Sequence, residues 1–268
     1  MDEKGFDIYR QVCIVAQDSP PPADGSLNHE TEINNLSSRM NTTIGILGTG
    51  RMAVRLAQLF ADAGHQVVLG SRTPQRARHI VAGLRHGSIR PGTYEQAADA
   101  PVVLPSMFMR DGMLDTLEPL RSRFDGKLFI DITNPFNDNY DDFILPWNTS
   151  AAEEIQHRFP RARVVGAFKN VWFEVFDQPK FDGSVSDVYV VADDHLAKQE
   201  FLTLVEGSPF RYLDAGKLAN ARFVERMTLF IAELGKREGF FPRMNWRLLG
   251  ESWRMGQADR YKELIVRN

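Results

Sequence analysis

Residues 42–61 read TTIGILGTGRMAVRLAQLFA, an apolar run that stops at a glycine-rich turn and continues as a helix-patterned segment. Strand, turn and helix in this order are the context in which a G-x-G-x-x-G/A fingerprint predicts a dinucleotide site. Gly48 permits the tight turn, Gly50 lets a pyrophosphate approach the backbone, and Ala53 is small enough for the helix to pack on the sheet. The helix N-terminus offers free N–H groups to the anion. The alternative interpretation is a tight turn that binds nothing.

The second strand, predicted at residues 66–70, leads into Ser71 and Arg72. NAD-binding versions usually carry Asp or Glu at this place, where the carboxylate accepts hydrogen bonds from the ribose hydroxyls. Ser71 instead donates a hydroxyl, and Arg72 offers a planar guanidinium that suits a 2′-phosphate. Arg76 and Arg78 add positive charge one turn later. We therefore expect NADP(H) rather than NAD(H), with a solvated basic helix start as the alternative.

The composition is typical of a soluble globular protein, with 43% hydrophobic and 25% charged residues in a chain of 268. A net charge of -3 gives no electrostatic reason to expect nucleic acid or an anionic membrane as partner. The single cysteine, Cys13, excludes an intrachain disulfide and a cysteine cluster for a structural metal. The sequence has no apolar run of about 20 residues and no export signal at its start. We expect a cytoplasmic protein with no metal.

The chain divides by composition into three parts. Residues 1–40 are polar and proline-rich, which predicts a disordered N-terminal tail. From residue 41 to residue 214, strand patterns alternate with helix patterns, which predicts an α/β, Rossmann-type, doubly wound and mainly parallel sheet. Beyond the first two strands, further strands are predicted at 87–90, 101–105, 127–132, 164–168, 188–192 and 210–213.

The remaining part, residues 215–268, is predicted to be a small C-terminal helical region. Apolar residues recur there at three- and four-residue spacing, which predicts an amphipathic helix of about twenty residues. Gly239 and Pro242 end it. We expect the apolar stripe to form core and also to join two copies into a homodimer. The stripe comprises Leu218, Ala221, Val224, Met227, Phe230, Ile231 and Leu234.

Several segments together resemble the NADPH-dependent oxidoreductases of the deazaflavin-coenzyme (F420) type. That family shares its N-terminal domain with pyrroline-5-carboxylate reductase and with the reductase domain of ferric-reductase membrane proteins. The resemblance spans roughly residues 43–235, and its order and spacing are specific to the superfamily rather than to one member. Its segments are IGILGTG at 44–50, GSR at 70–72, DITNP at 131–135, VGAFKN at 165–170 and LDAGKLANAR at 213–222.

The resemblance implies cofactor contacts at the carboxyl ends of successive strands, where open α/β sheets bind ligands. The residues implied at the pyrophosphate and the 2′-phosphate are Gly48, Thr49, Gly50, Arg51, Met52, Ser71, Arg72 and Arg76. Those implied at the nicotinamide and its ribose are Leu104, Pro105, Ser106, Met107, Asn134, Pro135, Ala167, Phe168 and Asn170. The aromatic-rich stretch after Phe168 departs from the family pattern and leaves the substrate open.

Lys169 and Asn170 are the predicted catalytic residues. Hydride transfer needs orientation above all, but reduction of a carbonyl or imine also needs a proton, whereas a flavin-like ring can take its proton from solvent. Lys169 follows a buried strand, where desolvation lowers the proton affinity of a lysine and makes it a usable acid near neutral pH. Asn170 could orient the substrate. The alternative is a lysine that pairs with a loop carboxylate.

The sequence therefore predicts an NADPH-dependent oxidoreductase that acts on a small organic carbonyl or imine. A second possibility is an oxidoreductase that uses a deazaflavin (F420) or a flavin as co-substrate. A third, of another class, is a non-catalytic sensor that binds NADP(H). Trp172, Phe173 and Phe176 could wall an apolar substrate pocket or could be core.

Overall fold

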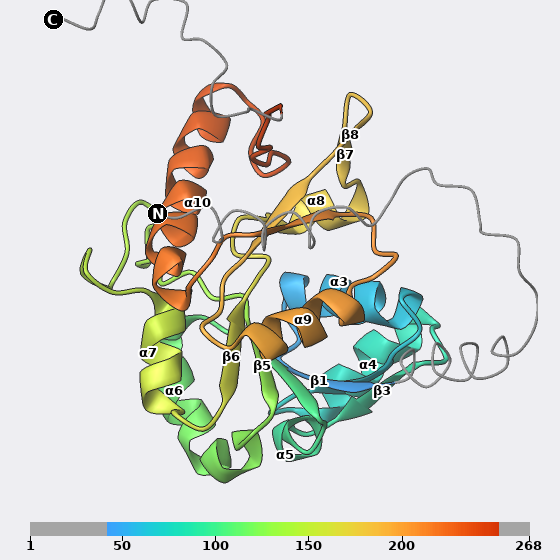
Figure 1. Cartoon of the computed structure of the whole chain (residues 1–268). Helices are drawn as coiled ribbons and strands as arrows, with labels where there is room; N and C mark the ends of the chain where they lie inside the picture. The colour runs from blue at the N-terminus through green and yellow to red at the C-terminus, as the bar shows by residue number, and fades with distance from the viewer. Residues whose placement is uncertain (1–41, 252–268) are drawn as a thin grey trace, which may run out of the picture. The chain divides into compact units, whose positions relative to one another are not determined.

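The computed structural model describes residues 42–251. Six parallel strands form the central sheet in the order β3-β2-β1-β4-β5-β6 (Figure 1). The chain adds strands outward from β1 first on one side and then on the other, so that the switch in direction lies between β1 and β4. The strands are β1 (Thr43–Leu47), β2 (Gln66–Gly70), β3 (Ile89–Gly92), β4 (Val102–Pro105), β5 (Leu128–Asp131) and β6 (Arg163–Gly166).

Helices cover both faces of this sheet (Figure 1). One apolar cluster packs α3 (Arg51–Asp62), α4 (Pro74–Leu84) and α9 (His195–Leu204) on one face. A second cluster packs α5 (Tyr94–Ala98), α6 (Met113–Leu117) and α7 (Ala151–Arg158) on the other. Ile44 and Ile46 of β1 belong to the first cluster and Leu47 to the second, because successive strand residues face opposite sides. The Rossmann-type α/β prediction is confirmed.

Two predicted elements differ in form. The helix predicted at 112–124 breaks into α6 and the 3-10 helix η2 (Glu118–Phe124), because Pro119 has no backbone N–H to continue the α-helical ladder. The last two predicted strands, β9 (Asp187–Val190) and β10 (Arg211–Asp214), form a separate parallel pair. A single antiparallel bridge, Gly166 to Val191, connects that pair to β6.

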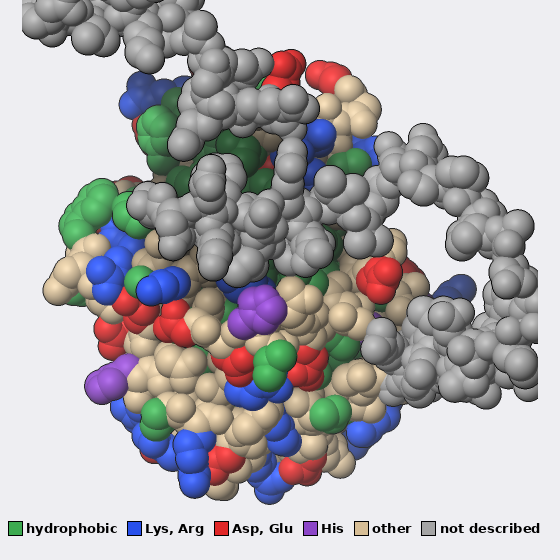
Figure 2. Space-filling view, in the orientation of Figure 1, with side chains coloured by type: hydrophobic (Ala, Val, Ile, Leu, Met, Phe, Trp, Pro, Cys, Tyr) green, Lys and Arg blue, Asp and Glu red, His purple; other side chains and the backbone are tan. Residues whose placement is uncertain are grey.

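The C-terminal helix α10 (Ala221–Arg237) follows the short 3-10 helix η3 (Leu218–Asn220). Its inner face joins the core, whereas Phe223 and Phe230 are exposed, and Phe230 lines a shallow pocket together with Trp147 of the loop before α7. Figure 2 shows hydrophobic side chains gathered on the side of the molecule where that loop lies. The homodimer stays a prediction, as do the domain boundaries.

Two further predictions concern residues at the chain ends. The disordered tail at residues 1–40 lies outside the described residues, as does the end of the C-terminal region from residue 252. Among the helices that the structure describes, none has the length and apolar character needed to cross a membrane.

Short elements complete the fold: η1 (Met109–Asp111), α8 (Phe173–Asp177), β7 (Lys180–Phe181) and β8 (Ser184–Val185).

Gly45 sets how closely α5 approaches β1. A Cβ atom at this position would overlap the carbonyl oxygen of Ala97 in α5, so only glycine fits without a shift of backbone. We expect Gly45→Ala to lower the free energy of unfolding by about 3 kcal/mol, because overpacking a rigid core forces backbone movement. Urea denaturation measures this. Gly83→Ala in α4 is the matched control, since a Cβ there meets nothing within 4 Å. An equal loss in both variants would contradict the packing argument.

Candidate functional site

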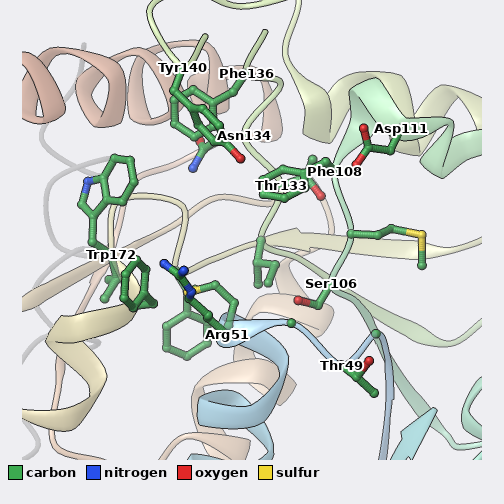
Figure 3. Close-up of a pocket in the computed structure, with 18 of the residues that line it drawn as sticks. Thr49, Arg51, Ser106, Phe108, Asp111, Thr133, Asn134, Phe136, Tyr140 and Trp172 are labelled. Atoms are coloured by element: carbon green, nitrogen blue, oxygen red, sulfur yellow. The ribbon is translucent and has the colours of Figure 1, made fainter. Parts of the chain in front are cut away.

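A cavity of about 1170 Å³ opens along the carboxyl ends of the central strands. It begins at the glycine-rich turn after β1, passes the loops after β4 and β5, and reaches the end of α10 (Figure 3). Open α/β sheets bind ligands at this edge, next to the point where the strand order reverses. Twelve of the predicted cofactor residues line the cavity: Gly48, Thr49, Gly50, Arg51, Met52, Ser71, Arg72, Arg76, Ser106, Met107, Asn134 and Phe168.

The glycine-rich turn leaves room for an anion. Gly48 has a φ of +143°, and a Cβ there would overlap the carbonyl oxygen of Ser106, so the turn lies directly against the loop after β4. Gly50 is the N-cap of α3, where a Cβ would meet nothing within 4 Å. Within the described chain, neither a side-chain cap nor an acidic residue occupies the first turn of α3. The N–H groups of this twelve-residue helix therefore remain available to a phosphate.

Basic side chains gather at the end of the cavity beside β2. The Arg76 Nε donates to Thr49 Oγ1 over 3.0 Å, so that the arginine lies against the glycine-rich turn. Ser71 is buried and its Oγ accepts from the backbone N–H of Thr73. Arg72 is exposed and faces Tyr94; burial raises the pKa of the Tyr94 hydroxyl, and the arginine partly opposes that effect. The predicted 2′-phosphate residues thus meet in one place.

The other end of the cavity is walled by aromatic rings. Of the three aromatic residues for which the sequence left wall and core open, Trp172 and Phe173 line the cavity, whereas Phe176 packs against Phe168 and Phe210 in the core. The sequence interpretation missed four further aromatic residues that line this end of the cavity: Phe108, Phe136, Tyr140 and Phe241. Two of these follow the DITNP segment closely, which was the available signal.

Arg110 holds two loops of this wall together. Its guanidinium carbon lies 4.3 Å from the ring centres of both Phe108 and Tyr140. The same group donates to the carbonyl oxygen of Asn137 over 2.9 Å and to the Tyr140 hydroxyl over 2.5 Å. These contacts connect the loop after β4 to the loop after β5. Arg110 is a site residue that sequence reasoning missed.

Five predicted nicotinamide contacts are not among the residues that line the cavity: Leu104, Pro105, Pro135, Ala167 and Asn170. Leu104 and Pro105 belong to β4, and with Pro135 and Ala167 they are buried. Strand β4 extends to Pro105, so the side chains of Leu104 and Pro105 are buried and do not line the cavity. Ser106 and Met107, which follow the strand, do line it.

Lys169 is not placed as the sequence predicted. Its side chain is fully buried and the residue is not among those that line the cavity. Its Nζ lies 2.6 Å from Asp131 Oδ2 and 2.8 Å from Glu225 Oε1, and it donates to the Thr133 carbonyl oxygen over 2.5 Å. Burial alone lowers the pKa of a lysine, but the two carboxylates outweigh it and raise the pKa of Lys169 above its ordinary value. The sequence predicted a lysine with lowered proton affinity that could act as an acid. The structure corrects this prediction, because two carboxylates hold Lys169 as an ammonium.

Asn170 is likewise structural in its contacts. Its Nδ2 donates to the Asp187 carbonyl oxygen over 2.8 Å and to Asn245 Oδ1 over 3.0 Å. Its Oδ1 accepts from the backbone N–H of Tyr189. Because the side chain is buried and bonded on both sides, it ties β9 to the segment after α10 rather than facing the cavity.

Glu225 completes the buried charged group, which we name the Lys169 cluster (Asp131, Lys169 and Glu225). Its carboxylate accepts from the backbone N–H groups of Ala151 and Ala152 at the N-terminus of α7. Burial raises the pKa of Glu225, Lys169 opposes that shift, and Asp131 adds to it. The sequence interpretation left open which carboxylate would pair with the lysine; one lies on β5 and the other on α10.

Comparison with known proteins agrees with this geometry. A family model described as NADP oxidoreductase, coenzyme F420-dependent, matches residues 43–135. The F420-dependent NADP reductase of Methanothermobacter thermautotrophicus is 31% identical over 212 residues, which cover 71% of this chain and 87% of that protein. A crystal structure of a candidate F420-dependent NADP reductase from Arthrobacter sp. FB24 has a TM-score of 0.68 at 23% identity, and the match covers 78% of this chain and 100% of that one.

A second relative, a metalloreductase, matches over a smaller share of its length. Metalloreductase STEAP3 of Rattus norvegicus is 31% identical over 186 residues, which cover 69% of this chain but 36% of that protein. The chain therefore spans little more than a third of the length of this relative.

The Lys169 cluster yields a prediction on stability. Lys169→Met leaves two buried carboxylates without their cation, which costs roughly 3–5 kcal/mol of unfolding free energy. The loss of the ammonium raises the folded-state pKa of Glu225 further above its unfolded value. Stability contributed by a group with a raised pKa is lost as the pH rises through that pKa, so the variant should regain stability as the pH falls through the raised folded-state pKa of Glu225 toward its unfolded value. Urea denaturation at several pH values measures both effects.

Lys198→Met is the matched control. Lys198 is also nearly buried, but its partner Asp214 is partly exposed and can be rehydrated. We expect a smaller loss with little pH dependence. Equal losses in the two variants at every pH would contradict the buried-charge argument.

Proposed function

We propose an activity from the premise that the chain belongs to the family of coenzyme F420-dependent NADP oxidoreductases. We infer that the protein transfers a hydride between NADP(H) and the planar ring of a deazaflavin or flavin. The observation that supports this most is one continuous cavity, with basic side chains and the glycine-rich turn at one end and aromatic rings at the other. The recognised family agrees with the resemblance drawn from the sequence, and that part of the prediction is confirmed.

The residues of the chain fit the phosphate groups of NADP(H). The uncapped N-terminus of α3 suits the pyrophosphate, since its N–H groups have no side-chain cap in the described residues. Arg72 and Arg76 suit the 2′-phosphate, because a guanidinium binds phosphate through paired N–H donors. In our proposal the cofactor supplies the hydride, and the protein supplies position and the exclusion of water.

The aromatic end favours a ring acceptor over a carbonyl or imine. Offset stacking on Tyr140, Trp172 or Phe173 would orient a flat tricyclic ring, since aromatic pairs gain free energy beyond the area they bury. A carbonyl or imine would need a positioned acid, and Lys169, the predicted donor, is held by two carboxylates away from the cavity. The carbonyl or imine reductase and the NADP(H) sensor remain as alternatives for the assay to decide.

One assay separates the three functions. NADPH oxidation is followed by absorbance with oxidised coenzyme F420, FMN, FAD and a panel of ketones and cyclic imines. We expect turnover with a deazaflavin or flavin and little with the rest. Turnover restricted to a ketone or imine would overturn the ring acceptor, and NADPH binding without any oxidation would support the sensor.

Arg72 should decide the preference for NADPH. Arg72→Ala removes a charge-assisted contact to the 2′-phosphate worth about 1.5–3 kcal/mol, so NADPH affinity should fall roughly ten- to a hundredfold while NADH affinity hardly changes. Calorimetric titration of both cofactors measures this. Arg78→Ala in α4 is the control, because Arg78 is exposed and is not among the residues that line the cavity. Equal weakening of both cofactors by Arg72→Ala would show a structural role for Arg72.

A further inference from the structure

The order of the strands assigns the two ends of the cavity to the two halves of the proposed cofactor. With the pyrophosphate at β1 and the basic residues beside β2, the nicotinamide half must extend to the opposite side, over β4 and β5. Asn134 follows β5 and lines the cavity on that side (Figure 3). The inference below rests on the proposed function, since it concerns NADP(H) in this cavity.

The side-chain amide of Asn134 can lie only one way round. Its Nδ2 is 2.7 Å from the carbonyl oxygen of Lys169. A carbonyl oxygen accepts hydrogen bonds and cannot donate, so the amide nitrogen must face it. The amide oxygen is therefore directed away from Lys169, and this oxygen is buried with no donor among the described residues. A buried acceptor without a donor is costly, which marks this atom as a place where a ligand donor would be favourable.

Lys169 fixes that orientation from two sides. Its Nζ holds the carbonyl oxygen of Thr133, the residue before Asn134, and its own carbonyl oxygen receives the Asn134 amide. Thr228 Oγ1 of α10 donates to the same carbonyl oxygen over 2.8 Å, which fixes it further. The two carboxylates of the Lys169 cluster hold the ammonium in place. One residue thus bonds both the carbonyl oxygen of the Thr133–Asn134 peptide and the side-chain amide of Asn134.

We propose that Asn134 Oδ1 accepts a hydrogen bond from the carboxamide N–H of the nicotinamide, and that Lys169 is the positioning residue that turns the amide oxygen toward it. The carboxamide is the N–H donor group of the nicotinamide ring. The hydroxyls of the nicotinamide ribose are donors too, and an analogue that lacks only the carboxamide N–H retains them, so such an analogue tells the two donors apart. A bond at this substituent fixes the rotation of the ring about its glycosidic bond. Asn134 therefore selects the face of the ring that is presented to the aromatic end of the cavity.

The test compares NADP⁺ with its 3-acetylpyridine analogue, which replaces the carboxamide by an acetyl group and so lacks the N–H donor. We expect wild-type protein to bind NADP⁺ roughly three- to tenfold more tightly than the analogue, the value of one hydrogen bond. Asn134→Ala should bind the two alike. Asn139→Ala is the matched control, because Asn139 lines the same cavity on an exposed loop and should keep the preference. Dissociation constants from calorimetry are the readout, and no turnover is needed.

A second probe separates this inference from the proposed function. 2′-Phospho-ADP-ribose lacks the nicotinamide, so it should bind wild type, Asn134→Ala and Asn139→Ala with equal affinity. Failure of wild type to bind either this probe or NADP⁺ would overturn the proposed cofactor itself. Normal binding of the probe, together with an Asn134→Ala variant that still prefers NADP⁺ over the analogue, would overturn only the role of Asn134.

Lys169→Met tests the positioning role. The titration is made at the lowest pH at which urea denaturation shows wild type and variant both folded, because protonation of Glu225 favours the folded variant as the pH falls. The probe 2′-phospho-ADP-ribose verifies that the phosphate end is intact. We expect the preference for NADP⁺ to fall while the probe binds as in wild type, because the Thr133 carbonyl oxygen loses its bond from Nζ, although the backbone carbonyl oxygen of residue 169 remains. A folded Lys169→Met variant that keeps the full preference would exclude Lys169 as the positioning residue.

Discussion

The buried ion pair between Lys169 and its two carboxylates is the constraint on which this site depends. Asp131 ends β5, Lys169 follows β6, and Glu225 belongs to α10, so one ammonium connects three elements that are far apart in the sequence. Glu225 in turn accepts from the first N–H groups of α7. A carboxylate at a helix N-terminus is favourable both as a hydrogen-bond acceptor and toward the helix dipole. The C-terminal helix is therefore joined to the sheet by charge as well as by apolar packing.

Such a cluster is a costly way to hold a fold together. Desolvation of buried charges often exceeds their mutual attraction, and well-packed apolar side chains would serve stability as well or better. An apolar side chain, however, could not bind the carbonyl oxygen of Thr133. The peptide plane at that carbonyl sets the direction of the next residue, Asn134, at the cavity wall. The hydrogen bond from the cluster fixes the orientation of the polar loop after β5. Apolar packing cannot do this, because dispersion contacts have no preferred direction.

The local parts of this architecture were readable from the sequence. The fingerprint at 44–53 depends only on residues that are adjacent in one strand, turn and helix. The expected NADP(H) preference depends on one position after β2, where a carboxylate is absent. The Lys169 environment was not readable, because Glu225 is 56 residues away and comes into contact only when α10 packs on the sheet. A lysine after a buried strand gives the same sequence signal whether it faces a cavity or a carboxylate. The sequence interpretation missed the wall formed by Phe108 and Tyr140 for a similar reason. Two separate loops come together with Arg110 to build this wall.

The two ends of the cavity differ in what they require of the backbone. At the phosphate end the proposed ligand would be held by N–H groups and by exposed arginines, which can adjust, so the glycines need only leave space. At the aromatic end the walls come from loops, which are mobile unless something fixes them. Arg110 fixes one pair of loops through its planar guanidinium, and Lys169 fixes the loop after β5 from beneath. Because hydride transfer depends on the distance and angle between two rings, rigidity is worth most at that end, where Arg110 and Lys169 hold the loops.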